Sequence, residues 1–198
     1  MSGLIPNTLD SQKGAPQGHI AGGIRIENND IHDNNNLNAP AYSLAYAVYG
    51  TGISVVGGVQ NDIVDNNVSN QQKYGIVVGP MPDQNFYQPE DNAVMRNTVK
   101  DSGRADLALS APASNNRFAE NEFDTSRPMM IERSDGSFRD PYIFLQMFKD
   151  YIQGESGGKF LHGETADQPL PDEETLGELP EMEDPENEPP KSPIGGRA

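Results

Sequence analysis

The stretch Ile63-Val-Asp-Asn-Asn-Val68 places an asparagine between two apolar residues that lie five positions apart. The same apolar-x-x-Asn-x-apolar unit occurs four times, with 37, 31 and 24 residues separating successive asparagines. A constant unit with variable spacing is typical of a solenoid whose coils carry loop insertions. The unit predicts two short strands joined by a tight bend, because asparagine tolerates left-handed backbone angles and bonds to the nearby chain. The four asparagines are Asn29, Asn66, Asn97 and Asn121.

A second kind of segment recurs between these units and alternates apolar residues with others. Such alternation is typical of a strand that buries one face. One coil is therefore expected to contain this strand, a connection, a second strand, the asparagine bend and a third strand. The three segments are Gly52-Ile-Ser-Val55, Gly75-Ile-Val-Val78 and Asp106-Leu-Ala-Leu109.

In this arrangement, roughly from residue 18 to residue 127, the sequence resembles the right-handed parallel β-helix proteins of the pectate-lyase-like family. The resemblance implies an all-β fold, a right-handed parallel β-helix of three to four coils, and an extracellular or cell-envelope location. Coils of that family often stack an asparagine ladder at such a bend. We therefore interpret the four asparagines as structural, with side-chain amides that bond from coil to coil.

The two ends of the chain differ from the repeated part. Residues 1–18 are polar and without periodicity, so they are expected to be poorly ordered, whereas residues 19–127 form the coils. No element that could cover the first coil is evident before Ile20, and we therefore expect either a longer β-helix or an end-to-end contact at an uncapped N-terminal coil. Residues 159–198 are acidic and rich in proline, and they are expected to be disordered.

Residues 128–158 are expected to hold a connection and a capping helix. Asp140 suits the N-cap position, Pro141 the first helical position and Gly154 the C-terminal stop. Apolar residues at helical spacing between them would form one face. We expect this helix to close the C-terminal end of the solenoid.

The charge of the chain is concentrated in its last part. The stretch from Glu164 to Glu188 holds 11 acidic residues and no basic one, and so accounts for most of the net charge of −16. Nucleic acid as a partner is not expected, because binding to phosphate needs a basic patch. Membrane insertion is not expected either, since no apolar run approaches the length of a membrane span. The absence of cysteine excludes disulfides and thiolate metal sites.

The best local cluster for acid-base or metal chemistry is formed by Asp30, His32 and Asp33. Asp30 and His32 lie two positions apart and could share one face of a strand. A solvated strand end is the simpler interpretation, because no second histidine or paired carboxylate has an evident register with them.

In the family that the sequence resembles, enzymes place their catalytic groups on the outward face of the first strand of successive coils. Alternation puts Ser54, Val77 and Ala108 on that face here. None of these side chains serves as an acid or a base at neutral pH. We therefore predict no catalytic residue, no metal site and no cofactor.

Aromatic side chains in two connections form the candidate binding set. Aromatic rings pack on the apolar faces of sugars, which makes a polysaccharide the candidate partner. The alternative is that these rings cover the coils as local core. The set consists of Tyr42, Tyr46 and Tyr49 in one connection and Phe86 and Tyr87 in the other.

Two functions from different classes remain open. The first is a non-catalytic β-helix domain that is structural or binds glycans weakly. The second is a fragment of a carbohydrate-active enzyme, a polysaccharide lyase, glycoside hydrolase or epimerase, whose catalytic coils lie outside this chain.

Overall fold

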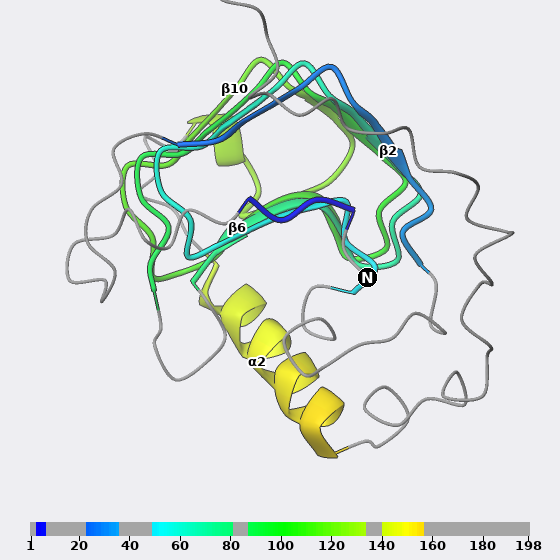
Figure 1. The fold of residues 1–198 in the computed structure, drawn as a ribbon, viewed down its shortest axis with the longest axis vertical. Coiled ribbons are helices and arrows are strands. Elements are labelled where there is room, and N and C mark those ends of the chain that lie inside the picture. Colours follow the sequence, from blue (N-terminus) through cyan, green and yellow to red (C-terminus); the bar gives the residue numbers. More distant parts are fainter. Residues whose placement is uncertain (1–2, 7–22, 36–48, 81–86, 134–139, 157–198) are drawn as a thin grey trace, which may run out of the picture. The chain divides into compact units, whose positions relative to one another are not determined.

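The repeated units fold into four successive coils of a parallel β-helix (Figure 1). The computed structural model describes residues 3–6, 23–35, 49–80, 87–133 and 140–156, which all belong to one compact unit, Met1–Ala166. The segments with Tyr42, Tyr46 and Phe86, most of residues 1–18 and the acidic tail lie outside the described residues.

Each coil contributes one strand to each of three parallel sheets. Sheet B contains β1 (Arg25–Glu27), β4 (Asp62–Val64), β7 (Ala93–Met95) and β10 (Arg117–Ala119). Sheet C contains β2 (Asp30–His32), β5 (Asn67–Ser69), β8 (Thr98–Lys100) and β11 (Glu122–Phe123). Sheet A contains β3 (Ile53–Val56), β6 (Tyr74–Gly79), β9 (Ala105–Leu109) and β12 (Ser126–Arg127).

The apolar residues of the repeated unit stack inside the coils. Ile26 pairs in register with Ile63, and Ile63 with Val94, so the first apolar position forms one column. The second position forms another column in sheet C. Both columns belong to the main hydrophobic core, in which most side chains are less than about a tenth exposed. The predicted β-helix and its asparagine unit are therefore confirmed.

The residue that turns the chain at each bend is the one before the repeated asparagine, not the asparagine itself. The left-handed residues are Asn28, Asp65, Arg96 and Glu120, with φ of 53° to 58°, and each precedes an asparagine of the repeat. These residues turn the chain, and the asparagine after each of them points its amide along the stack. A non-glycine residue pays a steric cost for such angles, and the stacked amides help to hold it there.

At the N-terminal end, a short segment adds to sheet A. Leu4 forms a parallel bridge with Ile53, and the amide N–H of Ser54 donates to the Leu4 carbonyl oxygen at 3.0 Å. Leu4 also packs against the main core. This contact was not expected from the sequence, because the two apolar residues between Gly3 and Pro6 are too few to show a strand pattern.

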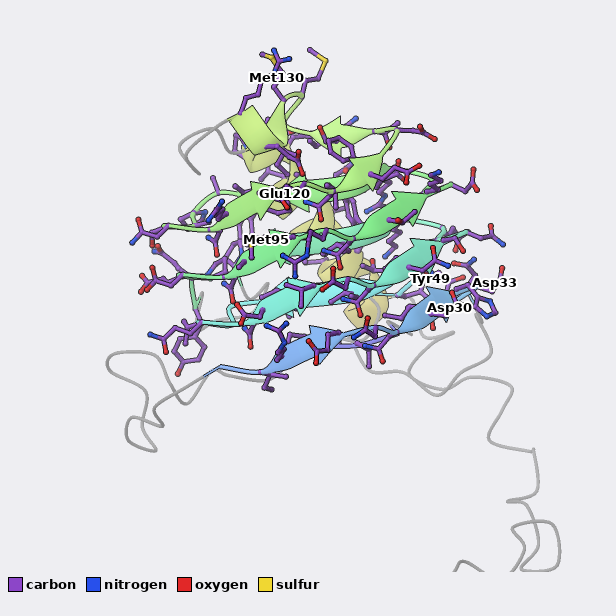
Figure 2. All side chains as sticks on the ribbon, turned by 90° about the horizontal axis from the view of Figure 1, so that it is seen from above. Asp30, Asp33, Tyr49, Met95, Glu120 and Met130 are labelled. Atoms are coloured by element: carbon purple, nitrogen blue, oxygen red, sulfur yellow. The ribbon has the colours of Figure 1, made fainter. Side chains whose placement is uncertain are left out.

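The C-terminal end is closed by a short 3₁₀ helix, η2 (Ile131–Arg133). Its Ile131 is 1% exposed and belongs to the main core. The loop just before η2 carries the exposed Met130, which lies at the end of the stack opposite Asp30 (Figure 2). An apolar plug thus covers the last coil.

The helix predicted from Asp140 is present as α2 (Pro141–Ser156), but it lies beside the coils instead of over their end (Figure 1). The Tyr142 N–H donates to Asp140 Oδ1 at 2.9 Å, which confirms the N-cap. Ile143 and Met147 pack on the outer face of sheet A. The expected position was incorrect because this face of the sheet is itself apolar and needs a cover.

Candidate functional site

The asparagine ladder between sheets B and C is a directed chain of hydrogen bonds. The backbone N–H and Nδ2 of Asn29 both donate to Asn66 Oδ1, at 3.1 and 2.9 Å. Asn66 repeats this pair of bonds to Asn97, and Asn97 repeats it to Asn121. The amide oxygens of Asn66, Asn97 and Asn121 thus each accept from the preceding coil. Asn66 and Asn97 are 2% and 1% exposed, which leaves them no role as ligands for a sugar or a cation.

The ladder ends on a carboxylate. The N–H and Nδ2 of Asn121 both donate to Glu132 Oε1, each at 2.7 Å. A carboxylate at neutral pH only accepts hydrogen bonds, so it terminates a chain that arrives as two donors. Glu132 is therefore the C-terminal cap of the ladder.

A second ladder runs where the chain enters sheet B, and sequence reasoning missed it. Asn61 N–H and Nδ2 donate to Asn92 Oδ1 at 3.0 and 2.8 Å, and Asn92 does the same to Asn116. Each of these asparagines precedes an asparagine of the first ladder by five residues. The first coil has Ile24 at this position, and its backbone N–H donates to Asn61 Oδ1. The constant spacing of five was the signal that could have revealed the second ladder.

The outer face of sheet A is buried. Ser54, Val77 and Ala108 stack in register as expected, and all three are at most 1% exposed. Val77 and Ala108 lie in a second apolar cluster with Ile143 and Met147 of α2. The strands of sheet A are therefore covered on both faces, whereas the sequence analysis expected them to bury only one.

A charged group fastens the middle of α2 to this sheet. Asp150 Oδ2 lies 2.7 Å from Lys73 Nζ and 2.9 Å from Arg104 Nη1, and the Asp150 side chain is only 8% exposed. Burial lowers the pKa of Lys73, although the neighbouring carboxylate acts in the opposite direction. Tyr74, whose pKa is raised by burial, donates its hydroxyl to Gln146 Oε1 at 3.0 Å. These contacts connect α2 to sheet A.

Asp106 is a buried carboxylate, but its bonds identify it as structural. Its oxygens accept the N–H groups of Ser102, Asp124 and Thr125, at 3.0, 3.1 and 2.9 Å, and also the Thr125 hydroxyl. Arg104, two residues earlier in the chain, bonds to Asp150 instead. A carboxylate that already accepts four hydrogen bonds and is 1% exposed is poorly placed to act as a base.

The described aromatic candidates are packed. Tyr49 is 4% exposed, and its hydroxyl donates to the Asn35 carbonyl oxygen at 2.6 Å. Lys73 Nζ lies 5.5 Å from the centre of the same ring. Tyr87 is half-buried and packs against the cluster between sheet A and α2. Both described rings are thus packed against neighbouring side chains, and because Tyr42, Tyr46 and Phe86 lie outside the described residues, the aromatic set stays a prediction.

His32, the last residue of β2, forms a pair with Asp33, and Figure 2 shows Asp33 beside Asp30 at the first coil. His32 Nδ1 lies 2.9 Å from Asp33 Oδ2, and both side chains are more than half exposed. The hydrogen bond to Asp33 and the charge of Asp30 raise the pKa of His32. An open cavity of about 330 Å³ adjoins them, lined by Gly3, Leu4, Asn29, Asp30, Ile31, His32 and Asn34. The structure therefore brings the His32 cluster together with a cavity at the first coil.

The outer faces of sheets B and C are polar and exposed. Arg96 binds Asp65 through two hydrogen bonds of 2.9 and 2.8 Å, which join the left-handed residues of two neighbouring bends. This bond lowers the pKa of Asp65. Lys100 Nζ similarly lies 2.6 Å from Glu122 Oε1 on sheet C. Among the described residues, no group of three or more histidine, cysteine, aspartate or glutamate side chains is arranged to hold a metal ion.

Comparison with family models, curated proteins and solved structures finds no match for this chain. In the part of the chain that the structure describes, no helix combines the length and apolar character needed to cross a membrane.

Proposed function

We propose that this chain is a non-catalytic β-helix domain with a structural role, and that it binds glycans weakly through the exposed polar face of sheet C. The observation that carries the proposal is the cover over sheet A. The face on which similar proteins place catalytic groups carries Ser54, Val77 and Ala108, and all three are buried. A general base must reach the proton that it removes, and no such group reaches solvent on this face.

The glycan part of the proposal rests on sheet C. Its outer face presents two rows of side chains that end in carboxylate, amide, hydroxyl, imidazole or ammonium groups, and these can bond to sugar hydroxyls. Neighbouring strands repeat at about 4.8 Å, so each row offers regularly spaced polar groups. The resemblance to pectate-lyase-like proteins supports a polysaccharide ligand and an extracellular or cell-envelope setting. The rows are Asp30, Asn67, Thr98 and Glu122, and His32, Ser69 and Lys100.

The test is a panel of uronic-acid and neutral polysaccharides, assayed for reducing ends and unsaturated products with and without calcium. We expect no turnover, because proton abstraction next to a carboxylate needs a positioned base and charge stabilisation. Turnover that disappears on His32→Ala or Asp33→Ala would overturn the proposal in favour of the enzyme.

Binding is measured in the same panel by affinity electrophoresis. An Asn67→Ala, Thr98→Ala double variant should weaken retention, whereas Asp62→Ala on the outer face of sheet B is the matched control. If only Tyr87→Ala abolished retention, the binding site would lie in the loop with Phe86 and Tyr87. If the unaltered chain were not retained at all, only the structural role would remain.

A further inference from the structure

Asn29 in the first coil lacks hydrogen bonds that its counterpart in the second coil makes. Asn66 Oδ1 accepts from Asn29, and Asn66 Nδ2 also donates backward to the Ile26 carbonyl oxygen at 2.9 Å. Asn29 Nδ2 donates to Glu27 O and to Asn66 Oδ1 only. Within the described residues nothing donates to Asn29 Oδ1. Both hydrogens of Asn29 Nδ2 therefore have acceptors, and the unmet bond is the one to Asn29 Oδ1, on the side that faces away from the second coil.

Asn34, just after β2, also lacks a hydrogen bond that its counterpart in the second coil makes. His32 pairs with Ser69, so Asn34 is the counterpart of Gln71. Gln71 Nε2 donates to the Ile31 carbonyl oxygen of the preceding coil at 3.2 Å and to the Ser69 carbonyl oxygen at 2.7 Å. Asn34 Nδ2 is buried and has no hydrogen-bond partner. A buried donor without an acceptor is costly, and here the position of the acceptor is defined by the second coil.

Only two of the three sheets are open at this end. Sheet A is continued there by Leu4, which bridges to Ile53. Sheets B and C end at β1 and β2 in the described part of the chain, and edge strands of this kind readily pair with another chain. The cavity beside β2 has a mostly polar lining, but Leu4 and Ile31 contribute an apolar part to it next to the open edge.

The direction of the ladder excludes a second copy of this chain as the natural occupant. The open end needs two donors, an N–H and an Nδ2, directed at Asn29 Oδ1. The opposite end of the same chain has these donors on Asn121, but Glu132 accepts both of them. Ile131 also covers the core of that end. Two open ends that face each other would oppose acceptor to acceptor.

We propose that the N-terminal edge of sheets B and C is a docking surface for a strand-bend-strand unit of a partner β-helix protein, a unit whose asparagine is not capped. The asparagine of that unit donates its N–H and Nδ2 to Asn29 Oδ1. A backbone carbonyl oxygen of the unit accepts from Asn34 Nδ2, and the apolar residue after its asparagine fills the cavity beside Ile31. Specificity comes from the ladder, since strand pairing alone does not select asparagine.

The experiment tethers such a unit to the full chain. A copy of residues 62–70 is fused ahead of Met1 through a flexible glycine-serine linker, which raises its effective concentration at the open end. The control fusion carries Asn66→Leu in the copied segment only. We expect amide exchange on the outer edges of β1 and β2 to slow by about tenfold or more in the first fusion and to stay unchanged in the control. The melting temperature should rise by a few degrees in the first fusion alone.

A variant of the docking surface completes the test. Asn29→Leu in the host, with the intact copy attached, should cancel the gain in exchange protection relative to the same variant without the copy. Equal protection with the intact and the control copy would overturn the proposal. Sedimentation of the chain without any fusion gives a further outcome: a dimer that disappears with Asn29→Leu would assign this end to a second copy and would also overturn it.

Discussion

The outer faces of sheet A and sheet C come from the same coils, yet one is buried and the other is exposed. Sheet A turns Val77 and Ala108 outward and is covered by α2, whereas sheet C turns out polar residues such as Asp30 and Asn67. Sheet A therefore lies between two apolar clusters, the coil interior and the helix interface. The comparison teaches that the outer face of sheet A serves stability, because its apolar side chains pack under α2, whereas the outer face of sheet C stays open to solvent.

The largest expected effect comes from uncovering sheet A. Ile143→Ala and Met147→Ala each remove a fully buried side chain from the interface of α2. Each should lower the free energy of unfolding by about 2–5 kcal/mol, because both the transfer free energy and a cavity contribute. Leu145→Ala on the same helix is the control, since Leu145 is 59% exposed and should change stability little. Chemical denaturation measures all three, and equal effects would show that α2 does not cover the sheet.

A buried ion pair at sheet A and an exposed one at the bend between sheets B and C should differ in their effect on stability. Asp150→Asn leaves Lys73 and Arg104 without their carboxylate at the sheet A interface, and we expect a loss of about 3 kcal/mol. Asp65→Asn removes the partner of Arg96 on the exposed bend, where a loss of at most about 1 kcal/mol is expected. Denaturation at low and at high salt distinguishes them, because only the exposed pair is screened. A larger loss for Asp65→Asn would reverse the comparison.

The ladder at the corner of sheets B and C should lie between these two cases. Asn66→Leu removes amide bonds to both neighbouring coils and leaves the N–H and Nδ2 of Asn29 without their acceptor, at a cost of roughly 1–3 kcal/mol. The adjacent Asn67→Ala is the matched control, because its exposed side chain bonds only to Asp30. We expect a change within about 0.5 kcal/mol for the control. An unaltered melting curve for Asn66→Leu would contradict the structural role of the ladder.

Local patterns in the sequence predicted the coils, the first ladder and α2, because each depends on residues close together in the chain. The asparagine unit fixes its own bend, and Asp140 caps its own helix. The second ladder is equally local, since Asn61 lies five residues before Asn66. Its asparagines lie outside the apolar-x-x-Asn-x-apolar unit, so the repeat did not reveal them.

The features that the sequence analysis missed depend on contacts between distant segments. In the sequence nothing distinguishes Glu132 from the other acidic residues. Only the fold shows its role, because it places Glu132 Oε1 beside Asn121. The alternation in Gly75-Ile-Val-Val78 predicted one buried face, although Val77 also turns an apolar side chain outward and so requires a cover. The sequence makes Tyr49 a candidate for packing against a sugar ring. Its burial and its contact with Lys73 identify it as part of the local core.

The smallest expected effect concerns His32 on the exposed face of sheet C. Its hydrogen bond to Asp33 and the charge of Asp30 raise its pKa above the ordinary value of 6.5. The protonated ring therefore adds a small stabilisation that is fully present below pH 6.5 and is lost as the pH rises through the raised pKa. Titration followed by NMR should place the His32 pKa above 6.5, and Asp33→Asn should move it back toward that value. Asp62→Asn on sheet B is the control and should leave the titration of His32 unchanged. A pKa of His32 that is insensitive to Asp33→Asn would show that the pair seen at the end of β2 does not persist in solution.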